Sequence, residues 1–501
     1  MSLLTAIVFL PVIGAILILI LPKDKPNIHR SAALVFSLLP FLLSLEVLFK
    51  FKCALDVMQF AENMPWIPAL GVNYHVGVDG LSVPLLVLTT LITLVSIIIS
   101  YNIEERVKEY FFWFLVLETG MLGVFVSLDF FLFYIFWEIV LVPMYFLIGI
   151  WGGPKKEYAA IKFFLYTLFG SVFMFIAILA LYFRAEPHTF DMLQLIQQNA
   201  QFAGKFEYIA FLFLFVAFAI KVPIFPFHTW LPLAHVEAPT AVSAVLAGVL
   251  LKMGTYGLMR VSFPMFPRAS LWFAVPLLIL AVINIIYGAL VSMAQTDIKK
   301  MVAYSSINHM GYALLGMAAF TVTGFNGAVL QMVNHGIITG SLFLLVGVIY
   351  DRAHTRDMNA FGGLGARLPI YTGLMTLAAL ASLGLPGLAG FISEFLCFLG
   401  AFASNEGYRL WGVIPVFKFF TALSVIGVLI TAGFFLRMLQ KVFLGPLNIK
   451  WSSLKDMDLR ELLAVIPLTI LTIVIGVWPH WLISIADATM NNLVNMIHGV
   501  K

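Results

Sequence analysis

The chain has 501 residues, of which 62% are hydrophobic and 11% are charged. Soluble domains are about 45–50% apolar and about 25% charged, so this composition predicts a polytopic membrane protein. The net charge of +4 is small and no basic run accompanies it, which argues against nucleic-acid binding. Two cysteines, Cys53 and Cys397, are too few for an iron–sulfur cluster or a zinc site, and both are expected to be packing thiols.

Fourteen apolar segments, each close to the length that crosses a bilayer, predict one all-α integral membrane domain over residues 1–501. The first segment lacks a basic leader and a small-residue cleavage site, so we expect a retained helix rather than a signal peptide. The spans are expected near 2–21, 31–49, 81–101, 110–127, 129–150, 160–183, 208–230, 239–262, 271–293, 301–319, 326–350, 371–403, 414–439 and 461–485.

Basic residues are distributed unequally between the two sides of the membrane. Loops after odd-numbered spans contain about twice as many lysines and arginines as the opposite side. Because basic loops stay in the cytoplasm, both termini are expected on the non-cytoplasmic side. Lys221 and Lys252 belong to neither group, since both lie inside apolar spans.

Two spans contain helix-breaking residues. Pro223 and Pro226 follow Lys221 and predict a break in span 7, because proline removes a backbone donor and clashes with the preceding turn. The run LGLPGLAG (383–390) predicts a second break in span 12, which is too long for one straight helix. A charged side chain beside a broken membrane helix is typical of an ion path.

Lys221, Lys252 and Glu138 are all expected near the middle of the bilayer. If Glu138 approaches Lys221, the pair holds a proton, and when the glutamate withdraws, the buried lysine tends to release it. A change of about 1000-fold in proton affinity equals about 4 kcal/mol. That matches the roughly 3.5–4.6 kcal/mol needed to move one charge against about 150–200 mV, so one switchable ion pair could drive one proton across.

Histidines titrate near neutral pH and are natural proton carriers between such sites. The expected path runs from the cytoplasm past His228 and His235 to the two lysines, and leaves through His309, His335 and Glu394. Structural alternatives stay open: the Glu138–Lys221 pair could only join helices, the histidines could pack or lie at the interface, and Lys252 could extend to an interface. Glu394 could stabilise the broken helix, and Glu118 faces an unknown side.

The two halves of the chain also show a matched spacing. The interval from Glu138 to Lys221 nearly equals the interval from His309 to Glu394. The two pairs are five spans apart, and an odd shift reverses topology, as in inverted-repeat transporters.

Five runs of sequence carry a resemblance to a known family: DGLSVPLLVLTTLITL, FYIFWEIVLVPMYFLIGIWG, KVPIFPFHTWLPLAHVEAPTAVSAVLAGVLLKMGTYGLMR, DIKKMVAYSSINHMGY and LGLPGLAGFISEF. They begin at residues 79, 133, 221, 297 and 383. The chain closely resembles, over essentially its whole length, the antiporter-like subunits of respiratory complex I, the NADH–quinone oxidoreductase. The resemblance implies fourteen helices, of which helices 7 and 12 are broken, and a proton channel. It also implies that spans 1–3, at about 1–101, are followed by two inverted five-helix repeats, at about 110–262 and 271–439.

Carried onto this sequence, the family's helix-5 glutamate is Glu138, its helix-7 lysine is Lys221 and its helix-8 lysine is Lys252. The helix-12 position is Glu394, where sister chains generally carry lysine. The resemblance implies that FMN, iron–sulfur clusters and quinone are bound by partner subunits, with no cofactor in this chain. It also implies partnership with the sister antiporter-like chains in a bacterial inner membrane.

No redox or nucleotide-binding motif is convincing in the chain. The run GGLGAR (362–367) lies in a loop without the strand–helix context of a dinucleotide site. Two other functions stay open from the sequence. The chain could be a subunit of a multisubunit Na⁺/H⁺ antiporter, or a non-conducting scaffold whose polar residues only hold helices together.

Overall fold

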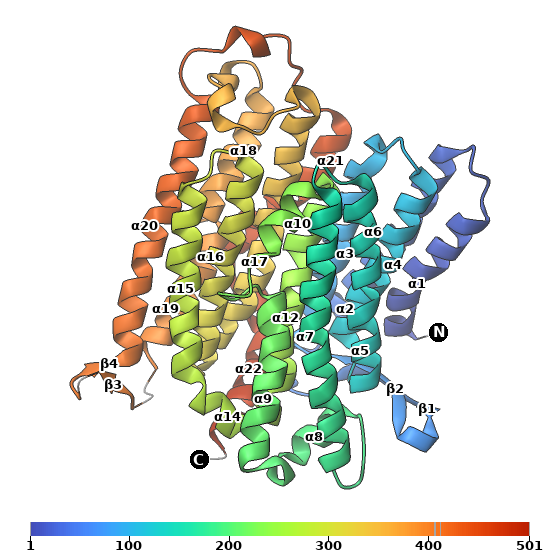
Figure 1. Ribbon diagram of the computed structural model, residues 1–501, viewed down its shortest axis with the longest axis vertical. Coiled ribbons are helices and arrows are strands. Elements are labelled where there is room, and N and C mark those ends of the chain that lie inside the picture. The colour runs from blue at the N-terminus through green and yellow to red at the C-terminus, as the bar shows by residue number, and fades with distance from the viewer. Residues whose placement is uncertain (1, 405–406, 411, 500–501) are drawn as a thin grey trace.

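The computed structural model describes residues 2–404, 407–410 and 412–499. The predicted sidedness of Met1 and Lys501 concerns residues outside these ranges. Within them the chain forms one elongated bundle of helices (Figure 1). The α-helices are α1 (Leu3–Ile20), α2 (Pro26–Lys50), α3 (Ser82–Ile99), α4 (Val107–Val126), α5 (Phe130–Ile139), α6 (Leu141–Trp151), α7 (Lys156–Arg184), α8 (Met192–Gln197), α9 (Lys205–Lys221), α10 (Leu231–Glu237), α11 (Thr240–Val245), α12 (Leu251–Gly257), α13 (Phe263–Met265), α14 (Pro267–Trp272), α15 (Ala274–Met293), α16 (Ile298–Ala318), α17 (Val322–Ala353), α18 (Pro369–Ser382), α19 (Ala389–Phe402), α20 (Val416–Phe443), α21 (Leu459–Val477) and α22 (His480–His498).

Shorter helical turns join these helices. Two π-helical turns, η4 (Leu246–Leu250) and η5 (Leu258–Ser262), connect α11, α12 and α13 into one continuous segment. The remaining turns are 3₁₀ helices: η1 (Pro68–Leu70), η2 (Ser100–Asn102), η3 (Asn199–Phe202), η6 (Met358–Ala360), η7 (Leu364–Ala366) and η8 (Ile449–Trp451).

Eleven segments in the described part of the chain are long and apolar enough to cross a membrane. α18 and α19 are shorter apolar helices that together occupy the predicted span 12. α9 and α16 occupy the predicted spans 7 and 10. The multi-span membrane architecture is therefore clear, while the count of fourteen stays a prediction.

The helix breaks occur at the two places where proline and glycine predict them. α9 ends at Lys221 and helix resumes only with α10, and α18 ends at Ser382 before α19 begins at Ala389. At the second break Gly384 and Gly387 adopt φ of +82° and +93°. Only glycine takes such angles without strain, so these residues allow the chain to turn sharply at this depth.

The fold is mostly helical, as predicted, and the loops in the described ranges also contain two small antiparallel sheets. β1 (Gln59–Ile67) pairs with β2 (Val72–Val78), and β3 (Arg409–Leu410) pairs with β4 (Ile414–Pro415). The β1–β2 hairpin lies in a long loop between α2 and α3, and it projects from the lower end of the bundle in Figure 1. The strands pair outside the spans, so they leave the helical membrane bundle unchanged.

The predicted last span, 461–485, is also wrong at its C-terminal end. α21 ends at Val477, and a separate helix, α22, starts after Pro479. Proline suits the start of a helix because its missing N–H has no intrahelical acceptor there. A hydrogen bond joins α22 to the loop that precedes α3: the N–H of Gly80 donates to Thr489 Oγ1 at 3.0 Å.

The centre of the bundle is formed by α17 and by the segment Thr240–Met265. All residues in the most apolar 18-residue stretch of each are buried, whereas only 28% of the corresponding stretch of α2 is buried. α17 packs against α3, α11, α16, α18, α19, α21 and α22. Polar residues on these two central segments must therefore find partners inside the protein.

Candidate proton-transfer site

The break after α9 places an ammonium group inside the bundle. Freed backbone groups near Lys221 are bound by Asn284 of α15, which accepts from the N–H of Phe225 at 2.8 Å and donates to the carbonyl of Pro223 at 3.3 Å. A buried backbone group without a partner costs free energy comparable to a lost hydrogen bond. Asn284 therefore stabilises the break that ends α9 at the lysine.

Lys221 is buried among aromatic rings. Its side chain is 1% exposed, and its Nζ lies 5.2 Å from the Trp137 ring centroid and 5.9 Å from that of Phe163. Aromatic faces attract a cation, most strongly when it is desolvated. Glu138 follows Trp137 in α5, and one of its carboxylate oxygens has no hydrogen-bond partner among the described residues. The switchable pair of Glu138 and Lys221 stays a prediction.

Lys252 lies at the centre of the bundle and contacts a histidine. It is 0% exposed on α12, directly after the π-helical turn η4, a distortion that often accompanies functional sites. Its Nζ donates to the carbonyl of Ala247 and lies 2.6 Å from Nδ1 of His335 on α17. The structure thus joins two of the predicted site residues directly.

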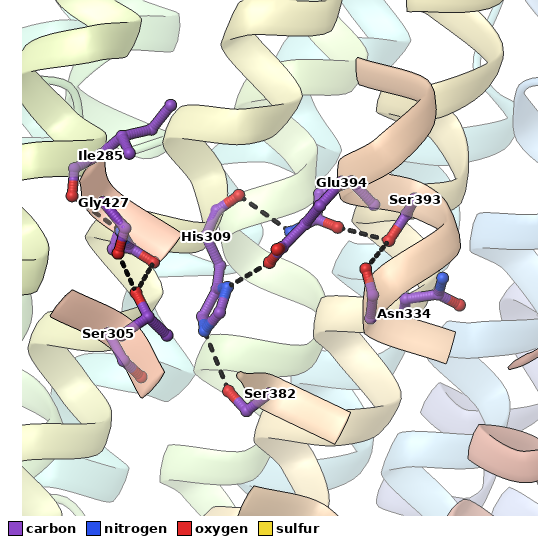
Figure 2. Close-up of polar contacts among 12 residues, drawn as sticks. Ile285, Ser305, His309, Asn334, Ser382, Ser393, Glu394 and Gly427 are labelled. Carbon is purple, nitrogen blue, oxygen red and sulfur yellow. Dashed lines mark hydrogen bonds and ion pairs between the residues drawn. The ribbon is translucent and has the colours of Figure 1, made fainter. Parts of the chain in front are cut away.

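His309 forms the next link, at the second helix break. Its Nδ1 lies 3.2 Å from Oε1 of Glu394 on α19, and its Nε2 lies 2.9 Å from the hydroxyl of Ser382 at the end of α18. Figure 2 shows the ring between these two side chains. α16 is fixed at its start by Asp297, whose side chain accepts from the N–H of Lys300, so the helix carries His309 to this depth about three turns later.

The two histidines are close enough for a single water molecule to join them. Their ring centroids are 5.9 Å apart. A cavity of about 10 Å³ is lined by both rings, by Glu394 and by amide and hydroxyl side chains of the same helices. A polar cavity of about 10–15 Å³ can hold one water. Lys252, His335, His309 and Glu394 therefore lie in one row, with direct contacts in its first and last pairs and a small cavity between the two histidines.

Amide and hydroxyl side chains hold this row in place. Asn334 donates to the carbonyl of Ala389 at 2.7 Å, at the start of α19, and Ser393 donates to Gln331 at 2.6 Å. Gln331 in turn donates to the carbonyl of His309 at 3.1 Å. Sequence reasoning missed Ser382, Asn334 and Gln331. Their only signal is that they are polar residues within or at the ends of apolar spans.

The other two predicted histidines lie apart from this row. His235 on α10 is 0% exposed and stacks on Phe343 at 4.4 Å between ring centroids. Neither of its ring nitrogens has a hydrogen-bond partner among the residues that the structure describes. His228 lies 3.1 Å from the hydroxyl of Tyr287 and makes no hydrogen bond with Lys221 or Lys252 in the described part of the chain. Both stay predicted relay residues.

Glu118 on α4 is a further buried carboxylate. It is 0% exposed and neither oxygen has a hydrogen-bond partner among the described residues. Burial inside the bundle answers the question of which side it faces. Within the described ranges it makes no hydrogen bond or ion pair with Lys221 or Lys252.

The chain matches a known family model. The family described as NADH:quinone oxidoreductase/Mrp antiporter, TM, matches residues 127–424. Subunit M of NADH-quinone oxidoreductase from Rickettsia prowazekii is 42% identical over 497 residues, covering 97% of each chain. The protein of the same name from Rhodobacter capsulatus is also 42% identical, covering 99% of this chain and 97% of its own.

Solved structures share the fold. A chain of respiratory complex I from Thermus thermophilus with bound NADH has a TM-score of 0.86 and 30% identity, covering 98% of this chain and 99% of its own. A chain of the Mrp complex from Dietzia sp. has a TM-score of 0.84 at 19% identity, covering 99% of this chain and 98% of its own. At that identity the second likeness concerns the fold alone.

Proposed function

The chain belongs to the NADH:quinone oxidoreductase/Mrp antiporter transmembrane family, and on that premise we propose that it moves protons as a subunit M-type membrane component (chain 4 in mitochondria) of an NADH–quinone oxidoreductase. Its relatives of nearly equal length carry the name of that subunit. The glutamate at position 394 agrees with this type, because the resemblance gives the sister chains a lysine there. The Na⁺/H⁺ antiporter alternative has less support, since its named relative here shares only the fold.

The connected row from Lys252 to Glu394 carries the proposal. A proton on Lys252 can pass to His335 across 2.6 Å, then through one water and the Ser382 hydroxyl to Nε2 of His309, and then from Nδ1 to Glu394 across 3.2 Å. Each member can hold and release a proton, and the row lies in the centre of the bundle. A scaffold needs no such unbroken series of titratable groups, because amides and hydroxyls already satisfy the helix breaks.

Lys221 and Glu138 form the proposed switch at the other end of the row. The ammonium faces aromatic rings while the carboxylate has an unpartnered oxygen, so closing the pair would change the proton affinity of Lys221. A difference of about 4 kcal/mol between the open and closed states would be enough to move one proton against the membrane potential. A charge change in a neighbouring subunit could bias this equilibrium by about 1–3 kcal/mol.

Electron transfer belongs to partner chains in this proposal. NADH oxidation on FMN and iron–sulfur clusters and the reduction of quinone would occur there, and this chain would contribute no redox centre. Its partners would be the other membrane-arm subunits, above all the sister antiporter-like chains. Its location would be a bacterial inner membrane, with both termini on the non-cytoplasmic side.

Two inverted five-helix repeats would explain why the same pair of aspartate helix caps occurs in each half of the chain. In the first half of the chain, Asp129 caps α5 and forms a β-bridge with Asp191, which caps α8. In the second half, Asp297 caps α16 and forms a β-bridge with Asp357, which caps η6. In Figure 1, α8 lies at the lower end of the bundle, whereas the loop after α17 lies at the upper end. Equivalent caps at opposite ends support repeats of about 110–262 and 271–439 within a fourteen-helix bundle.

The substitution Lys221→Ala tests the function. In inverted membrane vesicles that contain the assembled enzyme, NADH oxidation by an artificial electron acceptor should stay unchanged, while dye quenching that reports NADH-driven acidification should be lost. Lys205→Ala is the matched control, because Lys205 lies at the exposed start of the same helix. Full acidification in Lys221→Ala would contradict the proposal.

A further inference from the structure

A cavity of about 260 Å³ lies at the end of the bundle where the loops are rich in basic residues. It is formed where the loop after α6, the end of α10, the first turn of α16 and the end of α17 meet. Its wall includes the polar side chains of Glu237, Lys299, Asp351 and Arg356. A polar cavity of this size has room for several water molecules. By the orientation proposed above, it faces the cytoplasm.

Lys299 is the buried cation in this wall. It is 6% exposed, whereas its neighbour Lys300 is exposed on the same helical turn. Its Nζ donates to the carbonyl of Ala238 at 2.6 Å and to that of Val236 at 3.4 Å. No carboxylate forms a direct ion pair with it in the described ranges. In the described residues the direct partners of the ammonium are therefore two backbone carbonyls, beside the cavity.

Four other charged side chains lie near Lys299. Arg356 donates to the same carbonyl of Val236 at 3.0 Å and pairs with Asp297, which caps α16, at 3.2 Å. Glu237 instead accepts from the N–H of Lys155 at 2.9 Å, and Asp351 accepts from Asn102 at 2.8 Å. The acids near Lys299 thus already have partners, while a second cation shares its acceptor. This arrangement weakens the hold on the Lys299 proton.

The carbonyls that hold Lys299 belong to the chain segment that carries His235. Val236 follows this histidine directly, and the Oγ of Ser243 donates to the carbonyl of His235 at 2.9 Å. The ring lies on the interior side of this segment, fully buried and stacked on Phe343 of α17, the central helix that also carries His335. The segment therefore separates the cavity from the proton row.

We propose that Lys299 is the proton-loading residue of this chain, the group that takes protons from cytoplasmic water and passes them inward through His235 to Lys252. This rests on the proposed function. In the step, the Lys299 ammonium gives one proton to the neutral imidazole of His235, on the interior side of the segment, and becomes a free amine. A hydronium ion in the cavity then returns a proton to the amine and leaves water. His235 passes its proton to the free amine form of Lys252 and becomes neutral again.

A purely structural role for Lys299 gives a different expectation. As a cap for the end of α10, the side chain needs only a permanent positive charge and N–H donors, which arginine also supplies. Proton loading requires in addition that the charge can be lost, which arginine does not allow. Lys299→Arg therefore separates the two roles, and Lys300→Arg is the matched control.

The experiment uses the assembled enzyme in inverted membrane vesicles. For Lys299→Arg we expect NADH oxidation by an artificial acceptor at the wild-type level and NADH-driven acidification reduced about tenfold or more, with Lys300→Arg unchanged. Wild-type acidification by Lys299→Arg would overturn the proposal. Lys221→Ala, measured in parallel, tests the proposed function separately. If Lys221→Ala still acidifies the vesicles, the proposed function fails. If Lys221→Ala does not acidify them and Lys299→Arg does, only the loading role of Lys299 fails.

Lys299→His gives a second, independent test, in which the pH dependence of pumping is measured. This test does not depend on assembly of the Lys299→Arg variant. Imidazole loses its proton near pH 6.5 and lysine near 10.4 in water. If residue 299 loads the proton, the pH at which pumping declines should move to a lower value in this variant. A pH profile of pumping that matches the wild type would overturn the proposal.

Discussion

Nδ1 of His309 lies 3.2 Å from Oε1 of Glu394, and the two residues come from α16 and α19, helices that meet at the second break of the bundle. The hydroxyl of Ser382 holds the opposite ring nitrogen of His309 at 2.9 Å (Figure 2). This geometry makes His309 the link between the central histidine His335 and the carboxylate. It also fixes the ring in a position where it can receive a proton on one side and release it on the other.

Replacing His309 should therefore interrupt the row. We expect His309→Gln to reduce NADH-driven acidification by about tenfold or more, because glutamine keeps a hydrogen-bonding side chain but cannot carry a proton. Acidification in vesicles, normalised to NADH oxidation by an artificial acceptor, measures the effect. His188→Gln is the control, since His188 is exposed and bonds only to the carbonyl of Ala185. Equal pumping by both variants would show that protons bypass His309.

Asn284 should be required for the break after α9. Asn284→Leu leaves the N–H of Phe225 and the carbonyl of Pro223 without their partner, at a cost of about 1–3 kcal/mol for each buried group. We expect less chain in the membrane and a lower melting temperature. The control is Ser292→Ala on the same helix, because its hydroxyl bonds only to the carbonyl of Gly288. A melting temperature for Asn284→Leu equal to that of the control would refute the role.

Gly390 should tolerate no side chain. A Cβ there would lie 2.0 Å from the carbonyl oxygen of Ala381, where α19 passes the end of α18. Backbone atoms cannot move aside as a side chain can, so Gly390→Ala should separate the two helices and lower the yield of assembled enzyme. Gly373→Ala in α18 meets no atom within 4 Å and should be neutral or stabilising by about 0.5–1 kcal/mol. Immunoblots of membranes and melting curves compare the two, and a normal yield of Gly390→Ala would be inconsistent with this packing.

The helix breaks and the buried ionisable residues could be predicted from the sequence, because each depends on the residues at that place in the chain. Proline and glycine act on their own backbone, so both helix breaks can be predicted from Pro223, Pro226 and the run at 383–390. Buried ionisable residues in apolar spans are costly, which is why Lys221, Lys252 and Glu394 stand out as site residues. The contact between His309 and Glu394 agrees with the predicted order of the path.

Contacts between distant segments could not be predicted in the same way. Lys252 and His335 are 83 residues apart, and their 2.6 Å contact depends on how α12 and α17 pack. Lys299 looks like an ordinary loop cation in the sequence, because nothing in DIKK separates it from Lys300. Its burial results from the carbonyls at the end of α10, more than 60 residues earlier in the chain. The prediction ends span 14 at 485, although apolar residues recur at helical spacing after Val477 and are buried in α22.

Asp129 lies outside the spans, at the start of α5, and should make the stability of the fold depend on pH. Burial raises the pKa of Asp129 to about 6, and the negative charge of Asp191 adds to the effect, although three backbone N–H groups oppose it. The unfolded value is about 3.9, so the folded state binds the proton more tightly. The resulting stabilisation is complete below about pH 4 and is lost as the pH rises through about 6.

Asp129→Asn should remove this dependence. The amide oxygen can still accept from the N–H of Phe131, whereas the N–H of Asn73 loses its acceptor at every pH. From pH 5 to pH 7.5 the wild type should lose about 1.4 kcal/mol of its stability advantage over the variant. Labelling of the buried Cys397 thiol on heating, in a Cys53→Ser background, reports the melting temperature.

Asp191→Asn is a second test of this titration, because removing the negative charge of Asp191 should lower the pKa of Asp129. Burial acts to raise the pKa of Asp191, but the hydrogen bond with His75 and the backbone N–H groups outweigh it, and the pKa is lowered. Its contribution to stability is present above the unfolded pKa and is lost only as the pH falls through the lowered folded value, so it changes little between pH 5 and pH 7.5. If the wild type and Asp129→Asn kept a constant difference in melting temperature over this range, the Asp129 carboxylate would not titrate there.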